Sequence, residues 1–109
     1  MNTLVDKYKE EIAVIRLSKQ SIIDVGGAID DQIFEEHKIK LIEQIGALAE
    51  KYRIDIRIQR EGLVKSARKL TNSEDELARE LNEIDKQTKD SNTMIVELCE
   101  TKIKEIQNA

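Results

Sequence analysis

Cys99 and His37 are the side chains best suited to nucleophilic or metal chemistry, and each residue type occurs once in the 109 residues. They fall in different predicted helices, which leaves little material for a histidine-activated thiol. His37 has no second ligand type at the helical spacings where a metal site would need one. We expect a solvated His37, and at Cys99 a packed thiol beside Ile95 and Leu98.

A glycine-rich phosphate loop is also missing from the sequence. Gly26 and Gly27 are followed closely by Asp30 and Asp31, whose charges would repel a phosphate group. The sequence therefore predicts no catalytic residue, no cofactor and no metal site. We expect that the protein is not an enzyme.

Charge is the best-specified pattern, because a basic segment lies between two acidic ones. Residues 1–50 carry ten acidic and six basic side chains, residues 51–70 two and seven, and residues 71–109 ten and five. If the chain reverses near Asn72, attraction between the last two segments favours an antiparallel hairpin and sets its register. The basic members are Arg53, Arg57, Arg60, Lys65, Arg68 and Lys69, and the acidic members are Glu74, Asp75, Glu76, Glu80 and Glu83.

Arg53, Arg57 and Arg60 share one helix face, which leaves two other interpretations open. The first is a stripe for nucleic acid. The pI of about 5.1 and the lack of a recognisable motif argue against it, so we expect no nucleic acid partner. The second is a contact with the acidic face of a partner protein.

The elements that must position these residues are helices, because the chain has no proline and only four glycines. Apolar residues recur at three- and four-residue spacing, which predicts helices over about 3–25, 28–70 and 73–108. Ser73 and Glu76 match the capping box that begins a helix. We expect a single all-α domain, residues 1–109, folded as an antiparallel helical hairpin or an elongated three-helix bundle with coiled-coil-like packing.

Two segments admit a second interpretation. We interpret Gly26 and Gly27 as the first turn, and the alternative is a kink in a continuous helix. Residues 53–59 alternate between apolar and polar side chains, as a half-buried strand would. A lone strand has no pairing partner in this chain, so helix is the favoured interpretation and strand the alternative.

Residues 85–93 carry no apolar side chain, so we expect them to separate residues 91–109 as a semi-independent segment. The apolar residues Met94, Ile95, Leu98 and Ile103 would then form a detachable amphipathic face that docks in a partner's groove. On this interpretation, truncation after Asp90 leaves a folded protein that binds its partner less well.

A chain of this size has too few helices to bury all of its apolar residues, and Ile54 and Ile58 are among those left for an interface. We therefore expect a dimer or a complex with another helical protein. The residues predicted to bind the partner are Met94, Ile95, Leu98, Ile103, Ile54, Ile58, Arg53, Arg57 and Arg60.

The Val25-Gly26-Gly27 turn between two helices, with Phe34 shortly beyond it, resembles the WXG-type small helical proteins. The chain from Leu48 to Tyr52 and on to Glu76-Leu77-Ala78 is similar to the second helix of small partner proteins encoded beside type VII toxins. The resemblance covers about residues 20–84. It implies an antiparallel helical hairpin that dimerises and serves as a substrate or partner of bacterial type VII secretion.

We expect a non-enzymatic helical adaptor or targeting chaperone that binds a helical partner, with a type VII effector as one candidate. The alternative is a small regulator or inhibitor that occludes a partner's surface. No apolar run is long enough to span a membrane and the N-terminus is not a Sec-type signal, so we expect a leaderless cytoplasmic protein. Export by a specialised system is a further option, although the only tyrosines, Tyr8 and Tyr52, supply no C-terminal export signal.

Overall fold

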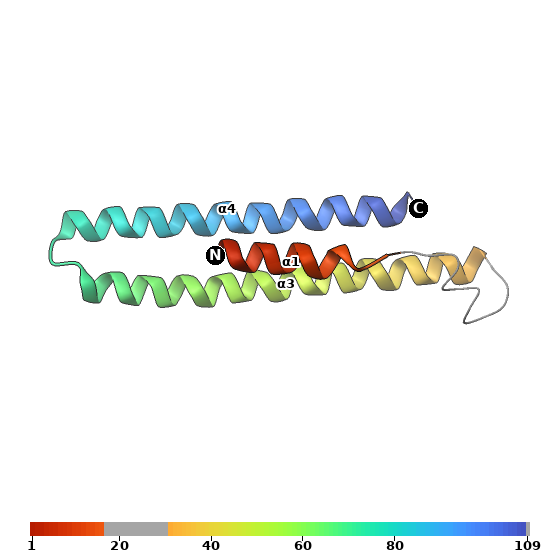
Figure 1. The fold of residues 1–109 in the computed structure, drawn as a ribbon, viewed down its shortest axis with the longest axis horizontal. Coiled ribbons are helices and arrows are strands. Elements are labelled where there is room, and N and C mark those ends of the chain that lie inside the picture. The colour runs from red at the N-terminus through yellow and green to blue at the C-terminus, as the bar shows by residue number, and fades with distance from the viewer. Residues whose placement is uncertain (17–30, 109) are drawn as a thin grey trace.

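The computed structural model describes residues 1–16 and 31–108. They form three α-helices and no strand: α1 (Asn2–Ala13), α3 (Asp31–Leu70) and α4 (Glu74–Gln107). α3 and α4 run antiparallel as a long hairpin, and α1 lies along the half of the hairpin that is far from its turn (Figure 1). The molecule is a rod of 67 × 20 × 16 Å. The predicted all-α class and the antiparallel helical packing are confirmed.

The hairpin turn at residues 71–73 is stabilised by a local hydrogen bond and by charge. The Ser73 hydroxyl accepts from the Glu76 amide at 3.1 Å, which confirms the predicted start of the last helix. α3 ends with Arg68 and Lys69, and α4 begins with three acidic side chains. Each group of charges complements the dipole of its own helix, so part of the charge segregation serves the helix ends.

α3 and α4 meet along seams of alternating three- and four-residue spacing, as in a coiled coil. On α3 the buried residues of the seam are Ile45, Ala49, Tyr52, Ile56 and Ala67. On α4 they are Ile84, Ser91, Ile95, Lys102 and Ile106. Lys102 keeps its ammonium 3.3 Å from the exposed Glu105 carboxylate, so its stem is buried while its charge reaches the surface.

α1 adds a third helix to one half of the hairpin. It buries one face, Val5, Tyr8 and Ile12, against both long helices. α1 runs parallel to α4 (Figure 1): the Thr88 hydroxyl, which donates to the Ile84 carbonyl, lies 3.5 Å from the Met1 sulfur, and Ile12 lines a hollow farther along α4.

The first predicted helix is wrong at its described end. α1 ends at Ala13, whereas the periodicity predicted a helix through residue 25. Val14 is 78% exposed, but Ile15, the next residue of the predicted stripe, is only 6% exposed and belongs to the core cluster, so burial continues past the end of the helix. Residues 17–30 lie outside the described part of the chain, as do the predicted turn at Gly26 and Gly27 and the predicted helix start at residue 28.

Residues 53–59 are helical throughout, and the strand alternative is wrong. Ile56 is fully buried in the seam, whereas Ile54 is 45% and Ile58 is 61% exposed. The alternation in the sequence therefore reflects two apolar faces of one helix, an inner face in the core and an outer face on the surface.

The C-terminal half of α4 belongs to the core, which corrects the expectation of a semi-independent segment at residues 91–109. The helix continues without a break through residues 85–93. Ile95 and Ile106 are 0% and 2% exposed and pack in the same cluster as α1. The polar stretch does not interrupt the packing because its inward positions carry small side chains, with Ser91 only 2% exposed.

The half of the hairpin next to the turn consists of two helices within the described ranges, and we call residues 57–87 the hairpin arm (Figure 1). Its buried apolar residues are Ala67 and Ile84. A segment with so few buried contacts has low local stability. The three-helix half therefore contributes most of the core.

We predict that Ile95→Ala lowers the free energy of unfolding by about 2–5 kcal/mol, because loss of a fully buried branched side chain leaves a cavity. Met94→Ala is the matched control, since Met94 is adjacent on α4 and 46% exposed. Its loss should stay below about 1 kcal/mol. Urea denaturation followed by circular dichroism measures both variants. Equal losses would contradict the placement of this segment in the core.

Candidate protein-binding groove

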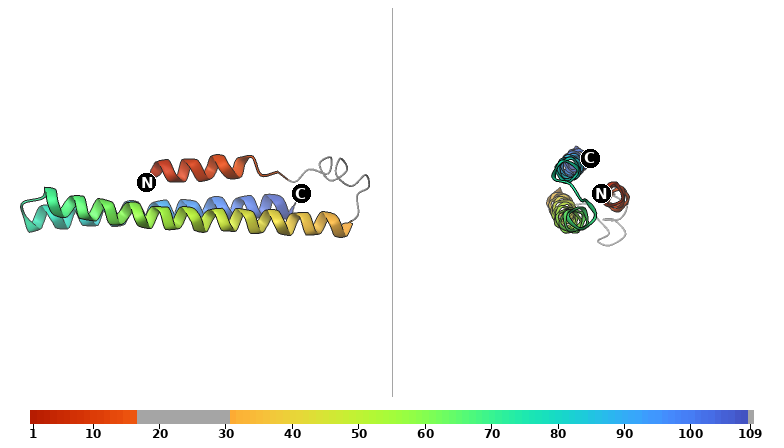
Figure 2. Two further views of the ribbon diagram at one scale, coloured as in Figure 1. Left: turned by 90° about the horizontal axis from the view of Figure 1, so that it is seen from below. Right: turned by 90° about the vertical axis from the view of Figure 1, so that its left-hand side faces the viewer.

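The α3–α4 hairpin has two long sides between its helices, and α1 occupies one of them (Figure 2). Three hollows share lining residues and have no residue of α1 in their lining. The first and third are lined by both α3 and α4, and the second by α4 alone. Arg53 borders the first and third hollows, Asn92 the first and second, and Val96 the second and third. We call the three hollows together the binding groove.

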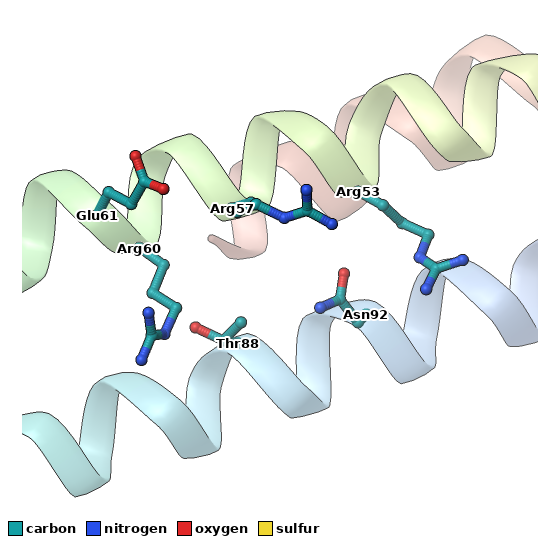
Figure 3. Close-up of a pocket in the computed structure, with 6 residues that line it drawn as sticks. All are labelled: Arg53, Arg57, Arg60, Glu61, Thr88 and Asn92. Carbon is teal, nitrogen blue, oxygen red and sulfur yellow. The ribbon is translucent and has the colours of Figure 1, made fainter.

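The first hollow has a volume of about 350 Å³ and lies beside the start of the hairpin arm. Its residues are Arg53, Arg57, Arg60, Glu61, Thr88 and Asn92 (Figure 3). The arginines come from α3, and Thr88 and Asn92 come from α4 opposite them. The structure therefore brings together the three arginines that the sequence placed on one helix face.

The three arginines differ in how well they are neutralised. Arg60 donates from Nε and Nη2 to Asp85 Oδ1 at 3.0 and 2.8 Å. Arg53 lies 3.8 Å from a carboxylate of its own helix, with half of its side chain exposed. Arg57 makes no ion pair within residues 1–16 and 31–108. Its guanidinium is therefore free to pair with a carboxylate that enters the groove.

Asn92 adds an unsatisfied acceptor to the same hollow. Its Oδ1 is buried and has no hydrogen-bond partner in the described part of the chain. A buried polar atom without a partner costs about 1–3 kcal/mol, so a donor brought in by a ligand would remove that cost. The hollow thus combines a free cation with a free acceptor, and both favour a polar side chain from outside.

The third hollow, farther from the turn, has a volume of about 250 Å³. Four of its residues are small or apolar and three are charged: Gly46, Ala49, Val96 and Cys99, and Glu50, Arg53 and Glu100. A β-carbon on Gly46 would meet nothing within 4 Å, so packing inside the chain does not require a glycine there. Glycine in a helix interior costs about 0.5–1 kcal/mol relative to alanine. Without a side chain at this position, the backbone of a second helix can approach α3 closely. Cys99 is partly buried against the core, as predicted.

Tyr8 connects the α1 side of the hairpin with the groove. Its hydroxyl donates to the Ile45 carbonyl at 3.3 Å, and its ring is fully buried. Burial, with a smaller contribution from a hydrogen bond with Cys99, raises the pKa of Tyr8 above its ordinary value. The phenol therefore stays neutral. Its neighbour Cys99 lines the third hollow of the groove, so Tyr8 supports the groove from the core side.

Tyr52 holds α1 against α3. Its hydroxyl donates to the Glu11 carboxylate at 2.5 Å, and its ring lies 5.6 Å from the ring of Tyr8. The hydrogen bond to Glu11, followed by burial, raises the pKa of Tyr52 from 10.0 to about 12. The neutral phenol is therefore the form that the fold stabilises.

The other residues predicted to bind a partner do not share this groove. Ile54 and Ile58 lie on the outer face of α3. The four apolar residues of α4 have unlike environments. Met94 is exposed, Leu98 and Ile103 are partly buried against the core, and Ile95 is fully buried. They do not form a detachable face, because Ile95 is part of the core.

The basic and acidic segments lie on antiparallel helices, as predicted, but no member of the predicted acidic set forms an ion pair with a member of the basic set among the described residues. Among the residues described, however, the one ion pair between the two helices joins Arg60 to Asp85, which lies outside the predicted acidic set. The other predicted members are exposed, because apolar residues occupy the inward positions. Their charges act at the surface.

Sequence reasoning missed the α4 side of the groove. Thr88 and Asn92 lie in the polar stretch that was interpreted as a separator. The signal for Thr88 is the spacing of the α4 seam, which continues through Thr88 and Ser91 to Ile95 and leaves Asn92 beside the seam. A seam position filled by a small polar residue still belongs to the seam.

The chain has no match among protein family models, curated proteins or solved structures. No group of three or more metal-ligating side chains occurs within the two described ranges. The described helices also include none with an apolar stretch sufficient to span a bilayer. The function therefore has to be inferred from the groove and the surfaces around it.

We predict that Tyr52→Phe lowers the free energy of unfolding at neutral pH by about 1–2 kcal/mol, because Glu11 loses its donor. In the wild type, the stability due to Tyr52 is present below pH 10 and is lost as the pH rises through about 12. The variant should therefore lose less stability across this alkaline range. Urea denaturation at neutral and alkaline pH measures the difference, and parallel pH profiles would contradict it.

Proposed function

We propose that the chain is a helical adaptor that binds a helix of another protein in the groove between α3 and α4. The observation that carries the proposal is that one side of the hairpin is filled by α1 while the other side offers an elongated groove. A hairpin that binds one helix on each side makes a four-helix arrangement, in which every helix has packing neighbours. Docking of an amphipathic helix in a groove is also a recurrent mode of recognition, and here charged residues border the small and apolar ones.

The lining of the groove defines the chemistry of this partner helix. Near the arm it should carry a carboxylate for Arg57 and a donor for the Asn92 oxygen. Near Gly46 it should carry small or apolar residues, so that the two backbones come close. The expected occupant is therefore an amphipathic helix that is acidic at one end and apolar at the other.

The resemblance to WXG-type proteins supports the same role, since it implies a helical hairpin that accompanies another helical protein. In that setting the occupant would be a type VII secretion effector. The alternative role, a regulator that occludes a partner's functional surface, uses the same groove. The identity of the bound segment distinguishes the two roles.

A photo-cross-linking amino acid at Val96 tests the proposal in the native cell. Val96 borders two hollows of the groove, and the exposed Lys86 on the same helix, which lines none of the hollows, gives a matched control position. We expect cross-links from position 96 that map to a helical segment of another protein, and none to that segment from position 86. Cross-links confined to the chain itself would contradict the proposal. Cross-links to a partner's active surface would favour the regulator.

Two variants then separate binding from folding. Arg57→Glu should weaken the captured partner's binding by about tenfold or more and leave the melting temperature unchanged, whereas Lys40→Glu, the same charge change on an exposed residue that lines no hollow, should not affect binding. Gly46→Ala should stabilise the chain by about 0.5–1 kcal/mol and yet weaken binding, because its methyl group enters the groove. Full affinity in both variants would place the interface elsewhere.

A further inference from the structure

The outer face of α3 carries two exposed isoleucines on adjacent turns. Ile54 is 45% and Ile58 is 61% exposed, and neither belongs to the core cluster. We infer that this face is the interface of a two-fold dimer in which α3 packs antiparallel to α3 of a second copy of the chain. Ile54 and Ile58 line none of the hollows of the groove, so this apolar face is a second surface, which meets the groove only at Glu61.

The first support is the spacing of the residues on this face. They follow each other at alternating intervals of four and three residues, which is the spacing of a second coiled-coil seam: Ala47, Lys51, Ile54, Ile58, Glu61 and Lys65. All six side chains are exposed in the single chain. A seam of this length extends over about 27 Å of helix.

The second support is charge complementarity within one register. Residues at equal distances from a two-fold axis face each other in an antiparallel pair. With the axis at the level of Ile56, Ile54 faces Ile58 of the second copy, and Lys51 faces Glu61 of the second copy. Symmetry repeats both pairs. The isoleucines then form an apolar centre, with an opposite-charge pair on each side.

Neighbouring registers lack this match. A shift by one heptad places Ile54 against Lys65 and Ile58 against Glu61, and the opposite shift places Ile54 against Lys51. A parallel arrangement places Lys51 against Lys51 and Glu61 against Glu61, and like charges at such positions oppose association. The face therefore selects one orientation and one register of a second copy.

The third support is Gly62, which lies beside this seam on an exposed part of α3. A β-carbon there would meet nothing within 4 Å, so the glycine is not needed for packing inside the chain, although it weakens the helix. A glycine beside the seam lets the second α3 approach closely. The core faces of α3 stay directed toward α1 and α4, so dimerisation leaves the core unchanged.

Sedimentation equilibrium of the purified full chain tests the inference. The seam has few apolar layers, so we expect a dissociation constant of about micromolar order and a mass of twice 12.5 kDa at high concentration. Ile58→Asp should raise that constant by about tenfold or more. Ile39→Asp, at a 55% exposed position on α3 outside this face, should leave it unchanged. Circular dichroism melts at a concentration well below the dissociation constant, where the wild type is monomeric, should match the wild type for both variants, since both side chains are exposed in the single chain.

Charge reversal and cross-linking test the register. Lys51→Glu should weaken the dimer, and the double variant Lys51→Glu/Glu61→Lys should restore it. In a Cys99→Ser background, a mixture of Ile54→Cys and Ile58→Cys chains should form the mixed disulfide on oxidation in preference to either symmetric one.

Four results would overturn the inference. The first is a wild type that stays monomeric up to about 0.5 mM, far above a micromolar constant. The second is a dimer that survives Ile58→Asp, and the third is an equal loss of dimer affinity with Ile39→Asp. The fourth is formation of symmetric disulfides in preference to the mixed one. These measurements use the purified chain alone. A negative outcome therefore removes the dimer and leaves the groove function standing, whereas the cross-linking at Val96 tests the groove.

Discussion

The insertion of Tyr8 between α3 and α4 is the contact on which the arrangement of the chain depends. The ring is fully buried, its hydroxyl donates to the Ile45 carbonyl, and it lies against the ring of Tyr52. Tyr52 in turn donates to Glu11 at the other end of the same short helix face. A helix of only 12 residues is marginal alone, so these contacts are what keep α1 folded and in place.

The docking of α1 makes the two sides of the hairpin unlike each other. One side becomes the core, with Ile45, Ile56 and Ile95 fully buried. The other side keeps small residues and polar groups, including a free guanidinium at Arg57 and a free acceptor at Asn92. Because α1 reaches only as far as Thr88, the hairpin arm has two helices and little buried apolar surface. The core and the groove thus lie on opposite sides of the hairpin, and the arm adds little buried apolar surface.

The charged residues of α3 and α4 act mainly at the helix ends and on the surface, and they form few ion pairs between the two helices. The basic end of α3 and the acidic start of α4 each complement a helix dipole, and they attract each other across the turn. Only Arg60 and Asp85 form an ion pair between the helices in the described part of the chain, and exposed pairs of this kind contribute about 0–1 kcal/mol. The unpaired charges remain at the surface, where they favour one partner or one register over another.

The all-helical class, the antiparallel hairpin, the helix start after Ser73 and the buried apolar seam could be predicted from the sequence, because periodicity, the turn signal and capping chemistry are local. Periodicity could not predict where α1 ends, since Ile15 fits the periodic pattern and is buried although the helix has already stopped at Ala13. Periodicity also missed that the end of α4, with Ile95 and Ile106, belongs to the core and that Thr88 and Asn92 face three arginines. Periodicity shows that a residue lies on a face, but which helix covers that face depends on contacts between segments far apart in the chain. For that reason the outer isoleucines and the inner ones look alike in the sequence and differ only once α1 and α4 are in place.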